Sequence, residues 1–127
     1  MNDEYLSIIE EESPVYNIKH RAFYFSKNLV SFISNQKYER IHFSIFDQLL
    51  RSGTSIGANL VEGIAGSSKN DFIKFNIIAL KSANETKYWL CLIRDTIEID
   101  KSTIEPLINE VNEISKIIGA IVIKSRK

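Results

Sequence analysis

Few residues in this chain could bind a metal ion or act as a nucleophile: its 127 residues include two histidines, His20 and His42, and one cysteine, Cys91. A di-iron centre in a helical bundle needs a Glu-x-x-His pattern on each of two helices. The sequence does not supply this pair, because Asn17 stands three residues before His20. Cys91 lies in an apolar run, which is typical of a buried, inert thiol. We therefore expect no metal site, no internal disulfide and no cofactor.

Motifs for phosphate binding and acyl transfer are also missing from the sequence. Four of the five glycines lie within residues 53–69, but neither G-x-x-x-x-G-K-[ST] nor G-x-G-x-x-G occurs there. Serines are frequent, yet no histidine lies near a plausible nucleophile in the sequence. We predict that the protein is not an enzyme and has no small-molecule substrate.

A stripe of polar side chains follows one side of a predicted central helix. At 100° per residue the stripe spans about 80° and consists of Arg51, Ser55, Asn59 and Glu62. Two interpretations stay open: a solvated helix face, or a hydrogen-bonded contact with the next helix or another subunit. Gly53 and Gly57 lie on the opposite, apolar side. Glycine costs about 1 kcal/mol against alanine inside a helix, so this pair indicates close approach of a neighbouring helix.

The elements that must position these residues are four amphipathic helices, because apolar residues recur at spacings of three and four. The predicted helices cover residues 15–35, about 45–64, 68–96 and 102 onward. With only five glycines and two prolines, a sandwich or barrel with many turns is disfavoured. Short connections between four such helices predict an all-α fold, an antiparallel four-helix bundle over residues 14–127.

Two of these helices have recognisable start signals. Ser68 is followed by Asp71 three residues later, which is typical of an N-cap with an acidic group in the first turn. Ser102 and Glu105 repeat this pattern, with Pro106 expected in the first turn of the last helix.

Charge is unevenly distributed, although the formal net charge is zero. Residues 1–13 hold five acidic residues and no Lys or Arg, so we interpret them as an acidic N-terminal tail. Residues 95–115 sum to −5 and residues 116–127 to +4, which we interpret mainly as differently charged solvated helix faces. The sequence shows no targeting segment or apolar run that could span a bilayer, so we expect a cytoplasmic protein with no membrane partner.

The third predicted helix is apolar around more of its circumference than one partner can cover. Its apolar residues include Phe72, Ile73, Phe75, Ile77, Ala79, Leu80 and Cys91. Such a helix lies centrally in a fold or is covered by another subunit. In a bundle this small, we expect a homo-oligomer.

A family resemblance is carried by three segments: RSGTSIGANLVEG at residues 51–63, SKNDFIKF at 68–75 and ALKSANETKYWL at 79–90. From the first helix onward, the chain resembles the 23S rRNA intervening-sequence proteins. The matching positions are Arg51, Ser55, Ile56, Ala58, Asn59, Glu62, Gly63, Lys69, Phe72, Phe75 and Glu85. The resemblance implies an antiparallel four-helix bundle that assembles as a ring-like homopentamer and has no recognised catalysis.

Two function hypotheses follow. The first is a non-enzymatic oligomeric scaffold or adaptor, in which the residues expected to act structurally or at an interface are Arg51, Ser55, Asn59, Glu62, Gly63, Phe72, Phe75 and Glu85. The alternative is binding of RNA or DNA through a basic surface of the oligomer. The resemblance extends to accessory variability proteins of diversity-generating retroelements, which implies a reverse transcriptase as a further partner. The candidate nucleic-acid contacts are Lys19, Arg21 and Lys27 on the first helix and Lys74 and Lys81 on the third.

Overall fold

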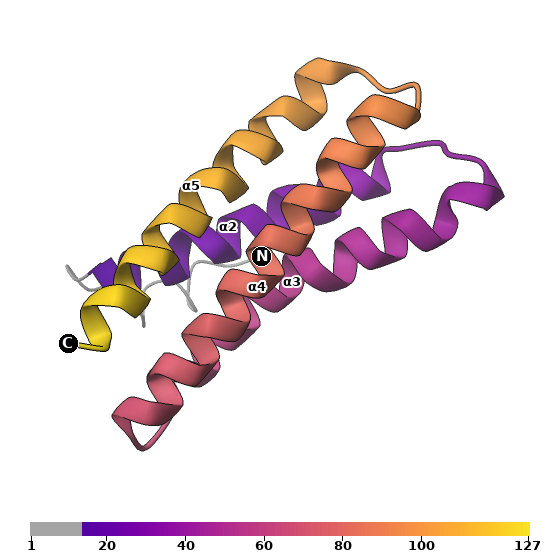
Figure 1. Ribbon diagram of the computed structural model, residues 1–127. Helices are drawn as coiled ribbons and strands as arrows, with labels where there is room; N and C mark the ends of the chain where they lie inside the picture. The colour runs from indigo at the N-terminus through magenta and orange to yellow at the C-terminus, as the bar shows by residue number, and fades with distance from the viewer. Residues whose placement is uncertain (1–13) are drawn as a thin grey trace.

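The computed structural model describes residues 14–127, with side chains from Ile18 onward (Figure 1). Its four long helices are α2 (Pro14–Ser34), α3 (Phe43–Ala65), α4 (Lys69–Thr96) and α5 (Lys101–Ser125), and a short 3-10 helix, η1 (Arg40–His42), precedes α3. No strand occurs in this part of the chain, so the predicted all-α class is confirmed. The predicted acidic tail, residues 1–13, lies outside the described residues.

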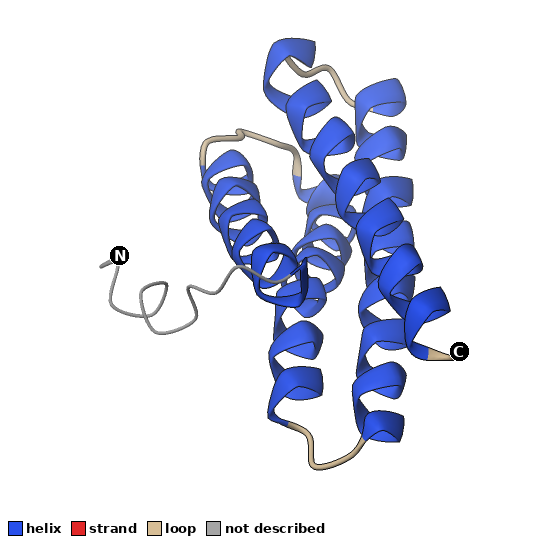
Figure 2. Cartoon of the chain, turned by 90° about the vertical axis from the view of Figure 1, so that its left-hand side faces the viewer, coloured by secondary structure: helices blue, strands red, loops and turns tan. Residues whose placement is uncertain are grey.

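Successive helices run antiparallel and each packs against its neighbours in sequence (Figures 1 and 2). The helix α2 contacts α3 and α5, and α4 contacts the same two helices from the other side. The most extensive contact joins α3 to α4. In consequence α2 and α4 lie diagonally opposite each other, which matters for any surface that combines their side chains.

One apolar core fills the space between the helices. Buried side chains on α2, α3 and α5 recur at spacings of three, four or seven, including Ile18, Ala22, Phe25 and Leu29 on α2, Leu49, Ile56 and Leu60 on α3, and Ile104, Val111, Ile114 and Ile118 on α5. On α4 the fully buried apolar positions are Ala79, Ala83, Leu90 and Ile93. Burial of aliphatic and aromatic surface is the dominant favourable contribution to folding.

Gly53 allows α2 and α3 to approach each other closely. A Cβ atom at this position would lie 2.0 Å from Leu29 Cδ2, closer than any real contact. At Gly57 the nearest atom would be the Ala22 Cβ at 3.6 Å, an ordinary contact distance. The predicted close approach is therefore confirmed at Gly53, whereas Gly57 is not sterically required.

The start of α4 follows the prediction and the start of α5 does not. Ser68 caps α4, because its Oγ accepts a hydrogen bond from the Asp71 backbone N–H at 3.1 Å. The N-cap of α5 is Asp100, whose carboxylate accepts from the Ser102 N–H at 3.0 Å. The prediction of Ser102 as the N-cap was wrong, since the carboxylate two residues earlier caps the helix first. As a result Pro106 lies in the second turn of α5 and not in the first.

The surplus apolar residues of the third predicted helix are only partly covered within one subunit. Ala79 is fully buried, whereas Phe72, Phe75, Ile77 and the other members of that set are half-buried. The large apolar side chains with the greatest exposure are Ile41 in η1, Ile123 on α5 and Tyr88 on α4 itself.

Candidate functional site

Hydroxyl groups connect α3 to α4 inside the bundle. Thr86 Oγ1 lies 2.9 Å from Ser52 Oγ and 2.7 Å from the Ser82 carbonyl oxygen, and both Thr86 and Ser52 are buried. Ser52 Oγ is also 3.3 Å from the Leu49 carbonyl oxygen, so each hydroxyl has an acceptor within reach. These bonds explain how two polar side chains occupy core positions, since a buried polar group without a partner costs about 1 to 3 kcal/mol.

Ser55 and Asn59 continue this connection toward the surface. Ser55 Oγ lies 2.9 Å from Ser82 Oγ on α4. Asn59 Nδ2 donates to the Ser55 carbonyl oxygen at 2.8 Å and to Ser55 Oγ at 2.9 Å. Asn59 therefore reaches α4 only through Ser55. We refer to Ser52, Ser55, Asn59, Ser82 and Thr86 together as the hydroxyl ladder.

The other two residues of the polar stripe, Arg51 and Glu62, point away from the bundle. Arg51 Nε forms an ion pair with Asp47 Oδ2 at 3.0 Å, one turn earlier on the same exposed surface. Glu62 is exposed and makes no hydrogen bond or ion pair with another residue of the described part. The stripe thus divides between a ladder that joins two helices and an outer pair that makes no hydrogen bond or ion pair with another helix. A role of Glu62 against a neighbouring protomer stays a prediction.

The remaining motif residues pack the turn between α3 and α4. A Cβ at Gly63 would lie 3.2 Å from Phe75 Cβ and 3.4 Å from the Phe72 carbonyl oxygen, so a larger residue would push the two helices apart. The buried Asn76 donates from Nδ2 to the same carbonyl at 2.8 Å.

Glu85 lies on the exposed part of α4. Its Oε2 accepts a hydrogen bond from Trp89 Nε1 at 3.0 Å, one turn later on the same helix. This contact orients an indole ring that is only half-buried. Like Arg51, Glu85 bonds only within its own helix.

The cations predicted on α2 do not form an open basic surface. Only 7% of Lys19 is exposed, and burial lowers the pKa of its ammonium group. Arg21 is engaged by Glu110 on α5, with Nε and Nη2 at 3.0 and 2.6 Å from the two carboxylate oxygens. The hydrogen bond to Glu110 raises the pKa of Arg21. Lys27 is exposed, with its Nζ 5.4 Å from the centre of the Tyr24 ring.

The two cations predicted on α4, Lys74 and Lys81, are both exposed. Lys74 Nζ lies 5.8 Å from the centre of the Phe75 ring, and Lys81 follows two turns later. Because α2 and α4 are diagonal to each other, the five predicted contacts do not share one face of a subunit. The structure brings together the α4 pair and separates it from the α2 group.

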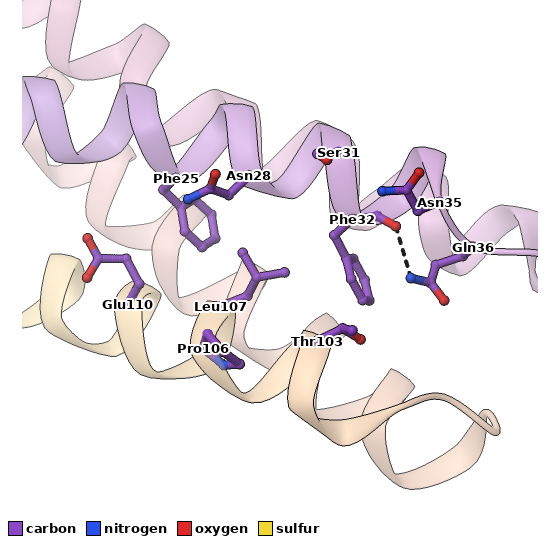
Figure 3. Close-up of a pocket in the computed structure, with 10 residues that line it drawn as sticks. All are labelled: Phe25, Asn28, Ser31, Phe32, Asn35, Gln36, Thr103, Pro106, Leu107 and Glu110. Carbon is purple, nitrogen blue, oxygen red and sulfur yellow. Dashed lines mark hydrogen bonds between the residues drawn. The ribbon is translucent and has the colours of Figure 1, made fainter.

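A groove of about 290 Å³ lies between the C-terminal half of α2 and the N-terminal half of α5 (Figure 3). Phe25, Phe32 and Leu107 form its apolar floor. Its polar lining includes the side chains of Asn28, Ser31, Asn35, Gln36, Thr103 and Glu110. No histidine or cysteine is in this lining, so the groove offers neither a general base of that type nor a thiol nucleophile.

The histidines do not assemble a metal centre within residues 18–127. Glu39 stands three residues before His42, so one Glu-x-x-His pattern does occur, at the start of η1. The Nδ1 atom of His42 is buried and makes no hydrogen bond to the described residues. No cluster of three or more potential metal ligands exists in this part of the chain. The absence of a metal site and of a cofactor stays a prediction for the whole chain.

None of the four long helices has an apolar stretch long enough to cross a bilayer.

Sequence reasoning did not identify Ser52, Ser82 and Thr86 as partners, nor the Arg21–Glu110 pair. Ser52 and Thr86 carried a weak signal, because each interrupts an apolar seam at a core spacing. No comparable signal exists for Arg21 and Glu110, since they are 89 residues apart and meet only once α2 and α5 are packed together.

Comparison with known proteins agrees with this fold. A solved structure from Bacteroides thetaiotaomicron, described as a protein of unknown function from the S23 ribosomal protein family, superposes with a TM-score of 0.79 at 37% sequence identity. The match covers 87% of this chain and 98% of the other. No curated protein matches the chain.

The family model of the 23S rRNA-intervening sequence proteins matches residues 15–120, which include the polar stripe, the hydroxyl ladder and the turn between α3 and α4. The resemblance in the three motif segments is thereby confirmed. The chain belongs to the 23S rRNA-intervening sequence protein family.

Proposed function

We propose that this protein is a non-enzymatic scaffold that works as a homo-oligomer. The observation that carries the proposal is that Arg51 and Glu62, two of the positions on which the resemblance rests, make no hydrogen bond or ion pair with another helix of their own subunit. Exposed charged residues that do not stabilise the subunit are available to an external partner.

The shape of the outer surface of α3 supports a second copy as that partner. Arg51 and Glu62 are eleven residues apart on one stripe, which places them about 16 Å apart along the helix. The exposed Ala58 lies between them, so a neighbouring helix can approach closely. Opposite charges at the two ends of the stripe allow Arg51 of one copy to meet Glu62 of the next copy, the head-to-tail arrangement that a closed ring requires.

The assembly that we propose is the homopentamer implied by the resemblance. Light scattering at micromolar concentration should give a mass of five subunits of 14.6 kDa each. A wild-type mass of 14.6 kDa under these conditions would contradict the proposal.

A charge exchange tests the contact itself. Arg51→Glu and Glu62→Arg should each weaken assembly, and the double variant should restore it, because the opposite charges meet again. Arg40→Glu at the exposed start of η1 is the matched control, which should leave the mass unchanged. Equal assembly of all four variants would remove the α3 stripe from the interface.

A further inference from the structure

The α4–α5 hairpin has opposite charge on its two halves. Residues 66–87 and 114–127 together contain eight Lys or Arg and two acidic residues, whereas residues 88–113 contain two basic and six acidic residues. Because α4 and α5 are antiparallel neighbours, the two basic segments lie side by side at one end of the hairpin (Figures 1 and 2). A protein with no net charge therefore has a concentrated positive surface.

We call this surface the basic half, and its cations are Lys69, Lys74, Lys81, Lys87, Lys116, Lys124, Arg126 and Lys127. Hydrogen bonds between α4 and α5 hold the two basic segments side by side. Lys87 Nζ donates to Asn112 Oδ1 and Ser115 Oγ donates to Asn84 Oδ1, each at 2.9 Å. At the end of the hairpin, the Nζ of Lys69 lies 3.5 Å from the Lys127 carbonyl oxygen.

The cations of the basic half are available to a partner. All eight residues are exposed. Within the described part of the chain, Lys116 is the only one of these cations with a side-chain carboxylate within 4.0 Å, that of Glu113 at 3.9 Å. In the acidic half, by contrast, Arg94 forms ion pairs with both Asp95 and Glu105. The charge of the basic half is thus largely uncompensated within the subunit.

We propose that the basic half binds the phosphodiester backbone of a nucleic acid. Uncompensated lysines gathered at one end of the hairpin attract phosphates, whose counterions are released on binding. Lys74 and Lys81 are seven residues apart, which places them about 10 Å apart along one face of α4, so both can contact the same strand. The acidic half repels the same ligand, so the strand lies across one end of the hairpin. Unlike the nucleic-acid contacts predicted from the sequence, this surface does not include the α2 cations, and it does include the cations at the end of α5. It is present in each subunit and does not depend on oligomer formation.

The experiment compares two triple variants of the full chain with the same change in charge. Lys74→Glu, Lys81→Glu and Lys124→Glu alter the basic half, while Lys27→Glu, Lys37→Glu and Lys101→Glu alter exposed lysines elsewhere. Fluorescence anisotropy measures binding of labelled single-stranded and duplex RNA and DNA of about 20 nucleotides, at about 50 and 200 mM salt. Thermal melting and light scattering check each variant for folding and oligomer mass.

The wild type should bind at the lower salt and weaken by orders of magnitude at the higher salt. The basic-half variant should bind at least about tenfold more weakly. Its salt slope, the change in the logarithm of the binding constant with the logarithm of the salt concentration, should be smaller by about three. The control variant should lose less than about threefold in affinity. Similar affinity for RNA and DNA strands identifies the shared phosphodiester backbone as the ligand. Tighter binding of one of them identifies that nucleic acid as the ligand.

The proposal would be overturned if the wild type formed no complex at the lower salt, or if both triple variants lost the same amount of affinity. Poly-glutamate bound as tightly as nucleic acid would also overturn it and would indicate an acidic protein partner instead. If the charge reversals lower the melting temperature or the oligomer mass, Lys→Gln at the same three positions removes the charge alone. The Lys→Gln variant should then show the same reduction in salt slope. An unchanged salt slope would mean that the basic half is not the binding surface. A monomeric wild type that binds RNA would contradict the scaffold proposal and leave this one standing.

Discussion

At Gly53 a single methyl group should disturb the packing of α2 on α3. The added Cβ would lie 2.0 Å from Leu29 Cδ2, and Leu29 is fully buried and has little room to move. Gly53→Ala should therefore lower the free energy of unfolding by about 1 to 3 kcal/mol, the usual cost of overpacking a core.

Gly57→Ala is the matched control for this change, because its Cβ would meet Ala22 at an ordinary 3.6 Å. Here the substitution should raise the free energy of unfolding by about 0.4 to 1 kcal/mol, since alanine restricts the unfolded chain. Urea unfolding of both variants measures the difference. Equal effects at the two glycines would show that the helices separate without cost.

Removing one hydroxyl from the ladder should be worse than removing two. Thr86→Val leaves Ser52 Oγ without its partner on α4 and should cost about 1 kcal/mol, whereas Ser52→Ala combined with Thr86→Val should recover part of that loss. Thr96→Val is the control, because Thr96 makes the same bond to the carbonyl four residues earlier on an exposed turn. Its effect should stay within about 0.5 kcal/mol. A cycle with no coupling between Ser52 and Thr86 would contradict the ladder.

At the scale of the helix, the cap of α5 makes stability depend on pH. Hydrogen bonds from Ser102, through its side chain and its backbone N–H, lower the pKa of Asp100 below its ordinary value. A carboxylate with a lowered pKa in the folded state stabilises the fold above its unfolded pKa, and this contribution is lost as the pH falls through the folded pKa. Asp100→Asn keeps a capping side chain but removes the titration.

The wild type should therefore melt above Asp100→Asn at about pH 7, and the gap should close below about pH 4. Circular dichroism melts over this range measure the gap. A difference that stays constant with pH would mean that the carboxylate charge plays no part in capping.

The helices could be predicted from sequence because their core residues repeat within a single element. Spacings of three and four are local, and they located α2 and α4 to within about one residue. Helix caps were harder to predict, because Ser102 and Asp100 can both cap the first turn of α5 and the choice depends on geometry. Contacts between helices could not be predicted from the sequence. Neither the Ser55–Ser82 bond nor the diagonal placement of α2 and α4 has a local signature.

Over the whole molecule, the candidate surfaces lie on different sides of one core. The α3 stripe with Arg51 and Glu62 is proposed to meet another copy, and the basic half of α4 and α5 to meet a polyanion. The half-buried apolar residues of α4 belong to a helix that contacts both α3 and α5. An oligomer built through α3 can thus keep the basic half of every copy accessible.

Self-association also predicts how thermal stability responds to dilution. If subunits fold and assemble together, mass action favours the assembly at high concentration, and the melting temperature rises with protein concentration. A tenfold increase contributes about 1 kcal/mol per subunit, or about 2 to 6 °C for a chain of this length. Thermal melts at about 2, 20 and 200 μM measure this rise. Arg51→Glu is the comparison, because a variant with a weakened interface assembles only at higher concentrations, and its melting temperature should begin to rise there. A melting temperature that is constant across the series, together with a single-subunit mass, would mean that the bundle is complete by itself and that its half-covered apolar surface on α4 costs it nothing.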